Sequence, residues 1–271
     1  MTLPILYHFA YSTCSQKVRM ALAEKGQQFE SREVNLLAGG QHDPEYVRLN
    51  PDHVVPTMIH EDEVLTESTL INDYVDDAFE GVALRSADPI MRYRAAALIH
   101  QVDDKLHGKV TGVFSHGVLT RGMVQSRPPE AIEAYLEAIP DPAERQLRTS
   151  LIGHGAQAPE MPPAVATMVA FFSRLETLLE SQQWLSGDSF GLADICVIPY
   201  VSRMAEIGLD AFWNEGAAPR VEHWIARTTT RPSFEVAFTR WMPEATAAMF
   251  KTFGEATRPG IEAIIRSAQG R

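Results

Sequence analysis

The chain has few cysteines and no excess of positive charge, and each shortage counts against a class of protein. Its 271 residues include only two cysteines, Cys14 and Cys196, which lie far apart in the sequence. This spacing argues against a disulfide framework and favours a reducing compartment, so we expect a cytoplasmic location. The formal net charge is −11, and no basic run interrupts the chain. That balance argues against nucleic acid or an anionic membrane surface as a partner.

Long apolar runs are also missing. No apolar stretch is long enough to span a bilayer, so we expect no membrane partner. The first residues, MTLPILYHFAYS, contain no basic region, and we expect no signal peptide. We find no internal repeat and no low-complexity segment. The apolar content of 45% and the charged content of 22% are typical of a globular protein, and the length allows two domains.

Strand and helix patterns alternate over the first 81 residues. A strand, a helix and a second strand in this order predict a parallel pair, and a following hairpin adds an antiparallel edge. Pro56 interrupts one of these strands, which indicates an edge position or a special backbone geometry. The predicted strands are 5–9, 29–36, 54–60 and 63–65, and the predicted helices are 11–25, 43–49 and 68–79.

Strand patterns fade after residue 88, and the remainder is predicted to be helical. Gly191 and Asp194 stand three apart at the start of one helix, which is the spacing of a capping box. Cys196 follows in the same apolar run, and we interpret it as a core residue. Residues 108–125 and 157–163 are predicted loops, and 241–271 is too apolar for a disordered tail. The predicted helices are 88–110, 129–139, 142–154, 164–182, 192–208, 219–229 and 232–238.

Four small polar residues open the first helix directly after a strand: Ser12, Thr13, Cys14 and Ser15. A helix N-terminus carries unpaired N–H groups and a partial positive charge, so it stabilises a thiolate or a bound anion. The same residue types are also preferred helix caps. This stretch by itself therefore leaves a reactive thiol and simple capping as equal alternatives.

The segments together resemble the cytosolic glutathione transferases over essentially the whole chain. The matching segments are STCSQKVRMALAEKG, GGQH, RLNPDHVVPTMIH and LTESTLINDYVDDAF, with LADI at 192–195 and RPSF at 231–234. The resemblance implies the glutathione transferase fold: an α/β thioredoxin-like N-terminal domain, 1–81, that binds glutathione, and an all-α C-terminal domain, 88–271, that binds the second substrate. It also implies a homodimer.

The resemblance further implies a glutathione site. It implies a cis bond before Pro56 and places the backbone of Val55 against the cysteinyl part of glutathione. It places Glu67 and Ser68 at the γ-glutamyl end, where the N–H groups of a helix start suit a carboxylate. Gln41, His42 and His53 are implied at the glycyl end, and a solvated loop is the alternative for both histidines.

The catalytic position has two candidates, Cys14 and Ser15, and activation by Tyr7 or Tyr11 is a less favoured alternative. The segment STCSQK looks most like the glutathione-dependent reductive dehalogenases, and it also resembles the β-aryl etherases and the ganglioside-induced differentiation-associated proteins. Lys17 stands where a Cys-x-x-Cys motif would need its second cysteine, which removes a dithiol cycle.

The implied function is attack of the glutathione thiolate on a hydrophobic, aromatic electrophile, by conjugation, β-aryl ether cleavage or dehalogenation. The alternative is a non-catalytic module for ligand binding or protein association. His100, Asp103, Asp104 and His107 fall on one predicted helical face, which we interpret as pocket lining or a solvated face and not as a metal site. We expect 108–125 and the tail to narrow the pocket, so that deleting 250–271 changes substrate affinity.

Overall fold

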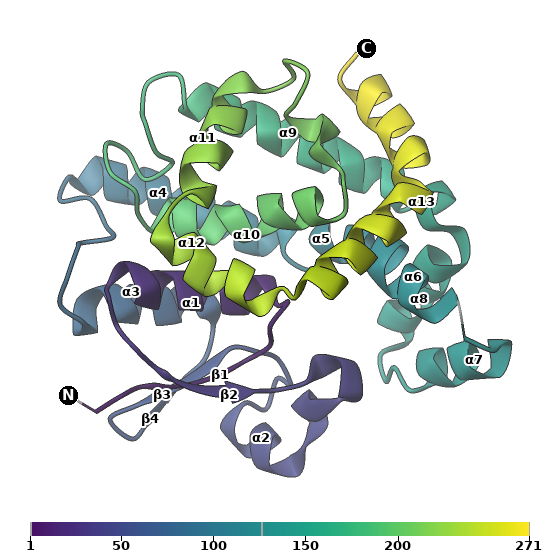
Figure 1. Ribbon diagram of the computed structural model, residues 1–271, viewed down its shortest axis with the longest axis horizontal. Coiled ribbons are helices and arrows are strands. Elements are labelled where there is room, and N and C mark those ends of the chain that lie inside the picture. Colours follow the sequence, from purple (N-terminus) through teal and green to yellow (C-terminus); the bar gives the residue numbers. More distant parts are fainter. Residues whose placement is uncertain (1, 126, 271) are drawn as a thin grey trace. The chain divides into compact units, whose positions relative to one another are not determined.

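A four-stranded mixed sheet is the first feature of the computed structural model, which describes residues 2–125 and 127–270 (Figure 1). The strand order is β2-β1-β3-β4. β1 pairs in parallel with β2 and antiparallel with β3, and β3 pairs antiparallel with β4. The strands are β1 (Ile5–His8), β2 (Glu30–Glu33), β3 (Thr57–His60) and β4 (Glu63–Leu65). The parallel pair and the hairpin predicted from the sequence are confirmed.

Helices cover both faces of this sheet. Helices α1 (Thr13–Glu24) and α3 (Ser68–Ala78) lie on one face, and α2 (Pro44–Leu49) lies on the other (Figure 1). Two short 3₁₀ turns, η1 (Leu36–Ala38) and η2 (Gly40–His42), connect β2 to α2. The α1 side chains Val18, Ala21 and Leu22 lie at helical spacing and are fully buried, as this pattern predicts.

Packing divides the chain into two compact units, and neither is continuous in sequence. The described residues of the first unit are 2–100, 182–199 and 224–243, and those of the second are 101–125, 127–181, 200–223 and 244–270. The domain boundary expected between residues 81 and 88 stays a prediction. The first unit includes α12 (Pro232–Ala237), which packs against α1, and most of α4 (Pro89–Gln101).

A buried carboxylate organises the start of α10 (Leu192–Glu206) in the first unit. Asp194 accepts hydrogen bonds from the N–H groups of Leu185 (2.8 Å), Ser186 (3.1 Å) and Gly191 (3.1 Å), and from Trp224 Nε1 (2.7 Å). Trp224 belongs to α11 (Pro219–Thr229). A Cβ at Gly191 would lie 2.2 Å from the carbonyl oxygen of Leu84, so only glycine fits there. The capping arrangement predicted for Gly191 and Asp194 is confirmed, and it extends to a loop and a second helix.

The second unit is helical where the sequence predicts a loop. Residues 108–125 contain four glycines, but the structure is helical from Thr111, so that prediction is wrong. The helical segments are η3 (Val102–Leu106, a π-helical turn), α5 (Thr111–Phe114), η4 (Ser115–Thr120, also π-helical) and α6 (Arg121–Gln125). A Cβ at Gly117 would lie 3.0 Å from Met161 Cε, so this glycine permits close packing and does not mark a turn.

Helices α7 (Pro129–Glu137) and α8 (Pro142–His154) follow their predicted bounds closely, whereas the sequence sets no helix bounds for residues 155–157 or for the tail. Helix α9 begins at Met161, three residues before the predicted start, because Pro162 and Pro163 occupy a first turn that needs no N–H donors. The helices are α7 (Pro129–Glu137), α8 (Pro142–His154), η5 (Gly155–Gln157), α9 (Met161–Leu178) and α13 (Glu244–Ala268).

The C-terminal tail is helix α13, which packs against α9 inside the second unit. Its side chains Phe250, Ile261 and Ile265 are buried, so the tail is part of the core, as its apolar pattern predicts. Over the described ranges, none of the helices combines the length and the apolar content that a membrane crossing requires.

Candidate functional site

One edge of the sheet brings the predicted glutathione-site segments together. His8, the last residue of β1, pairs with Glu33 at the end of β2, while Tyr7 pairs with Thr57 at the start of β3. Leu65 at the end of β4 pairs with Met58. The start of α1, the 34–42 loop, the segment before β3 and the start of α3 therefore all emerge at the same edge. These segments carry every residue that the sequence assigns to this site.

Cys14 and Ser15 occupy different environments at the start of α1. Cys14 is half-buried, and neither it nor Cys196 is part of a disulfide. Ser15 is fully buried, and its Oγ accepts a hydrogen bond from the N–H of Phe9 at 3.3 Å. Ser12, which is half-buried, caps the helix by accepting from the N–H of Ser15 at 3.2 Å. Cys14 is therefore partly exposed to solvent, whereas Ser15 is not.

A buried arginine holds the turn between β1 and α1. Arg19 donates to the carbonyl oxygens of Phe9 (3.2 Å), Ala10 (2.8 Å) and Ala237 (2.8 Å). Burial lowers its pKa to about 9, so it stays charged at neutral pH. Burial, followed by the charge of Arg19, lowers the pKa of His8 to about 3, so a neutral His8 ring can accept from Arg19 at 3.1 Å. The sequence pattern treats Arg19 only as a charged helix position and misses this role.

Two buried polar side chains clamp the segment around Val55 and Pro56. The bond between these residues is cis, as the resemblance implies. The carbonyl oxygen of Val54 accepts from Tyr46 Oη (2.5 Å) and from Asn50 Nδ2 (3.0 Å), and both groups also reach Thr57 Oγ1 at 3.0 Å. This network fixes the backbone on either side of Val55. Tyr46 and Asn50 are positioning residues that the sequence reasoning missed.

The start of α3 presents Glu67 and Ser68 at this edge. Glu67 is exposed, has φ = 64°, and its side chain does not cap the helix. Ser68 is 7% exposed and begins the helix. Because the first N–H groups of a helix lack intrahelical partners, they can bind a carboxylate, while the exposed Glu67 carboxylate suits an ammonium group.

The three residues predicted at the glycyl end lie close to one another. His42 Nδ1 is 3.2 Å from His53 Nδ1, and Gln41 Nε2 is 3.2 Å from His42 Nε2. Both histidines are exposed, and His53 has φ = 57°. Gln41 Oε1 is buried and has no hydrogen-bond partner among the described atoms. The structure thus groups these residues, and their roles stay predictions.

The acidic and histidine residues predicted on one helical face do not form a simple stripe. The π-helical turn η3 contains Asp103 and Asp104 and shifts the helical spacing before His107. Asp104 and His107 are exposed, and Asp104 pairs with Lys109 at 3.2 Å. Across residues 2–125 and 127–270, no group of three or more metal-ligating side chains could hold a metal ion. Their part in binding an electrophile stays a prediction. Cys196 is fully buried, which confirms it as a core residue.

Two family models match the chain. Residues 6–83 match the glutathione S-transferase N-terminal domain, and residues 129–227 match the glutathione S-transferase C-terminal domain.

Three relatives extend the match over most of the chain. Protein LigF of Sphingobium sp. is 28% identical in sequence, and the match covers 86% of this chain and 92% of LigF. The crystal structure of LigF, described as a β-etherase, superposes with a TM-score of 0.76 at 25% identity. That superposition covers 88% of this chain and 100% of the LigF chain. Tetrachloro-p-hydroquinone reductive dehalogenase of Sphingobium chlorophenolicum is 29% identical, and the match covers 88% of this chain and 96% of the dehalogenase. Maleylacetoacetate isomerase of Rhizobium meliloti is 30% identical, and the match covers 73% of this chain and 79% of the isomerase. The chain belongs to the glutathione S-transferase superfamily.

Proposed function

We propose that this protein is a glutathione-dependent transferase in which the glutathione thiolate attacks a hydrophobic, aromatic electrophile. The relatives support this reaction class, because one is described as a β-etherase and another as a reductive dehalogenase of a chlorinated hydroquinone. In each variant of the step, a carbon–sulfur bond forms while the bond from that carbon to an ether oxygen or a halogen breaks. The leaving group departs with the electron pair of the broken bond.

The clamped Val55–Pro56 segment is the observation that carries the proposal. An extended peptide such as glutathione pairs with a backbone that is held in place, and Tyr46 of α2 and Asn50, the C-cap of α2, hold this one. Ser68 and the helix start would take the γ-glutamyl carboxylate, and Glu67 the ammonium group. Gln41, His42 and His53 would contact the glycyl carboxylate. These assignments place the thiol of glutathione toward the start of α1.

We propose Cys14 as the residue that acts on the sulfur, with Ser15 as the second candidate. The support is that Cys14 is half-buried at a helix N-terminus, whereas the Ser15 hydroxyl is fully buried and accepts from Phe9. The positive end of the helix favours an anion at this position, whether it is the glutathione thiolate or the Cys14 thiolate. Cytoplasmic location also stays a prediction.

A kinetic test separates the enzyme from the binding module. With chlorodinitrobenzene or an aryl β-ether ketone as electrophile, the wild type should form product only when glutathione is present. Ser68→Ala should raise the KM for glutathione about tenfold, since it removes a hydroxyl from the helix start. Ser189→Ala, at an exposed position, should leave the KM unchanged.

The alternative outcome is equally clear. Retention of the wild type on glutathione resin, with no turnover of either electrophile, would establish a non-catalytic binding module. If the wild type shows no retention on the resin and no turnover of either electrophile, the glutathione site itself is disproved.

We further propose a homodimer, supported by exposed apolar side chains in the first unit. Leu70 on α3 is 63% exposed, Tyr93 on α4 is 72% exposed and Val64 on β4 is 42% exposed. Leu70→Asp should shift the mass measured by light scattering from dimer to monomer, because burying an unpaired charge in an interface is costly. Leu37→Asp, at a position that is 65% exposed outside these elements, is the matched control. A monomeric wild type would contradict the proposal.

A further inference from the structure

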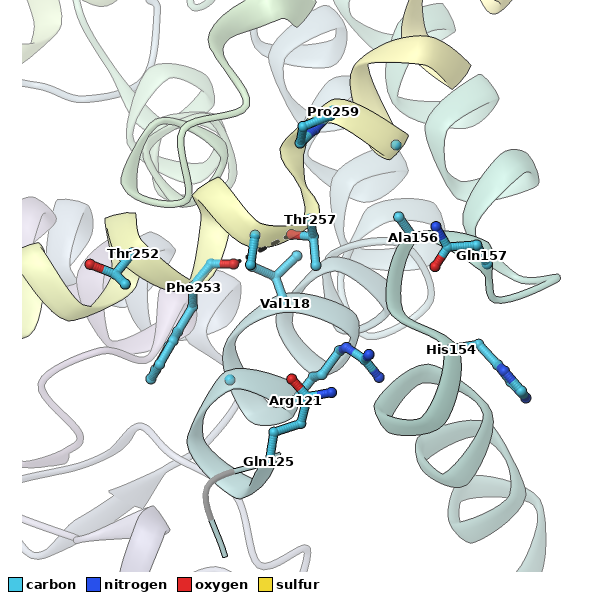
Figure 2. A pocket seen from close by; sticks show the side chains of 13 residues that line it. Val118, Arg121, Gln125, His154, Ala156, Gln157, Thr252, Phe253, Thr257 and Pro259 are labelled. Carbon is cyan, nitrogen blue, oxygen red and sulfur yellow. Dashed lines mark hydrogen bonds between the residues drawn. The ribbon is translucent and has the colours of Figure 1, made fainter.

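A cavity lies wholly within the second unit. It has a volume of about 460 Å³ and opens among η4, α6, η5 and α13 (Figure 2). None of the described residues that line it is an aspartate or a glutamate, although the chain carries 35 of these acids against 24 lysines and arginines. Its volume is within the range of small-molecule sites. Because no described lining side chain is negatively charged, the cavity is suited to an anionic ligand.

Arg121, the first residue of α6, supplies the positive charge of this cavity. Its Nη1 donates to the carbonyl oxygen of Ile152. The amide of Gln125 lies against the same guanidinium, and with its oxygen turned inward it accepts from Nη2 at 2.8 Å and, at 3.3 Å, from Nε and Nη1. No carboxylate of the described residues lies within ion-pair distance of Arg121. Two neutral oxygens do not neutralise a guanidinium or use all of its five N–H donors, so an anionic acceptor can still bind.

Two glycines make room for the side chains that define the cavity. A Cβ at Gly122 would lie 2.3 Å from Cγ of Phe253, so the glycine allows the aromatic ring to lie against α6. Gly155 has φ = 56°, and a Cβ there would lie 2.9 Å from Arg121 Nε. The positions of Arg121 and Phe253 therefore each require a glycine beside them, Gly155 next to Arg121 and Gly122 next to Phe253. Figure 2 shows Arg121 on the α6 side and Phe253 and Pro259 on α13.

We propose that this cavity binds a small organic carboxylate, with the carboxylate on Arg121 and the apolar body against Phe253 and Pro259. Arginine pairs with carboxylates through two parallel hydrogen bonds, and the ring supplies apolar contact area. The lining residues belong to the second unit, whereas all candidate glutathione residues belong to the first. The site therefore stands independently of the proposed reaction.

Titration calorimetry with benzoate tests the site, with benzamide as the neutral probe of the same shape. Benzoate should bind at least about tenfold more tightly than benzamide, and Arg121→Gln should remove this difference, because a charge-assisted pair is lost. Arg266→Gln, which removes an equal charge from an exposed position of α13, is the matched control and should bind benzoate as the wild type does.

A second variant keeps the test decisive if Arg121→Gln fails to fold. Gln157 is exposed at the lining, so Gln157→Glu adds an adverse charge without disturbing the Arg121 contacts and should weaken benzoate binding several-fold. Gln146→Glu, an exposed change on α8, should have no effect. Equal affinities for benzoate and benzamide, unchanged binding in Gln157→Glu, or displacement of benzoate by glutathione would each overturn the proposal.

Discussion

Replacing Asp194 with alanine is expected to lower the free energy of unfolding by about 3–5 kcal/mol. The carboxylate is fully buried and accepts from four N–H donors, which come from the 185–191 loop and from Trp224. Alanine leaves all four donors buried without a protein acceptor. Unfolding in urea, followed by tryptophan fluorescence, measures the loss directly because Trp224 is one of the donors.

Two further variants define the origin of this effect. Asp194→Asn keeps an oxygen at Oδ1 for the N–H of Leu185 and for Trp224 Nε1, so its loss should be smaller than that of the alanine variant. Asp188→Ala removes an exposed carboxylate from the same loop and should change stability by less than about 0.5 kcal/mol. An Asp194→Ala protein within 1 kcal/mol of the wild type, a difference of about fivefold in the folding equilibrium, would show that the burial cost of the charge cancels its hydrogen bonds.

The sequence predicts those elements whose ends carry their own chemical signals. Helix α8 begins at Pro142 after the capping residue Asp141, and its predicted bounds, 142–154, match the structure. The 108–125 segment fails for the opposite reason. Its glycines look like loop residues, but Gly117 and Gly122 lie inside helical segments. The Met161 side chain packs against Gly117, and the Phe253 ring packs against Gly122. A glycine needed for close packing and a glycine needed for a turn look the same in one sequence.

In the candidate site, too, the sequence predicts features that depend on neighbouring residues and misses contacts between residues that are distant in the sequence. The strand–helix–strand connection predicts the parallel pair of β1 and β2. Pro56 and Ser68 reach the same end of the sheet as Cys14 because β3 pairs antiparallel with β1, and the sequence indicates this only through the family resemblance. The clamp on Val54 and the buried contacts of Arg19 depend on backbone oxygens, which have no identity in the sequence. The different burial of Cys14 and Ser15 likewise depends on how Phe9 approaches the helix start.

Incubation with glutathione disulfide is expected to add one glutathione to the wild-type protein at Cys14. The Cys14 thiolate attacks one sulfur of the disulfide, a new sulfur–sulfur bond forms, and the second glutathione leaves as a thiolate. Partial exposure and the positive helix end both favour this attack. Cys14→Ser should reduce the adduct measured by intact mass by about tenfold or more, because serine cannot form the mixed disulfide.

Cys196 provides the matched control, since it is the second thiol of the chain and is fully buried in α10. Cys196→Ala should retain the adduct at the wild-type level. An adduct that persists in Cys14→Ser, or is lost in Cys196→Ala, would place the reactive sulfur elsewhere. Absence of any adduct in a wild type that still binds glutathione would transfer the chemistry to a hydroxyl. Because the Ser15 hydroxyl is buried, that result would require the start of α1 to open when glutathione binds.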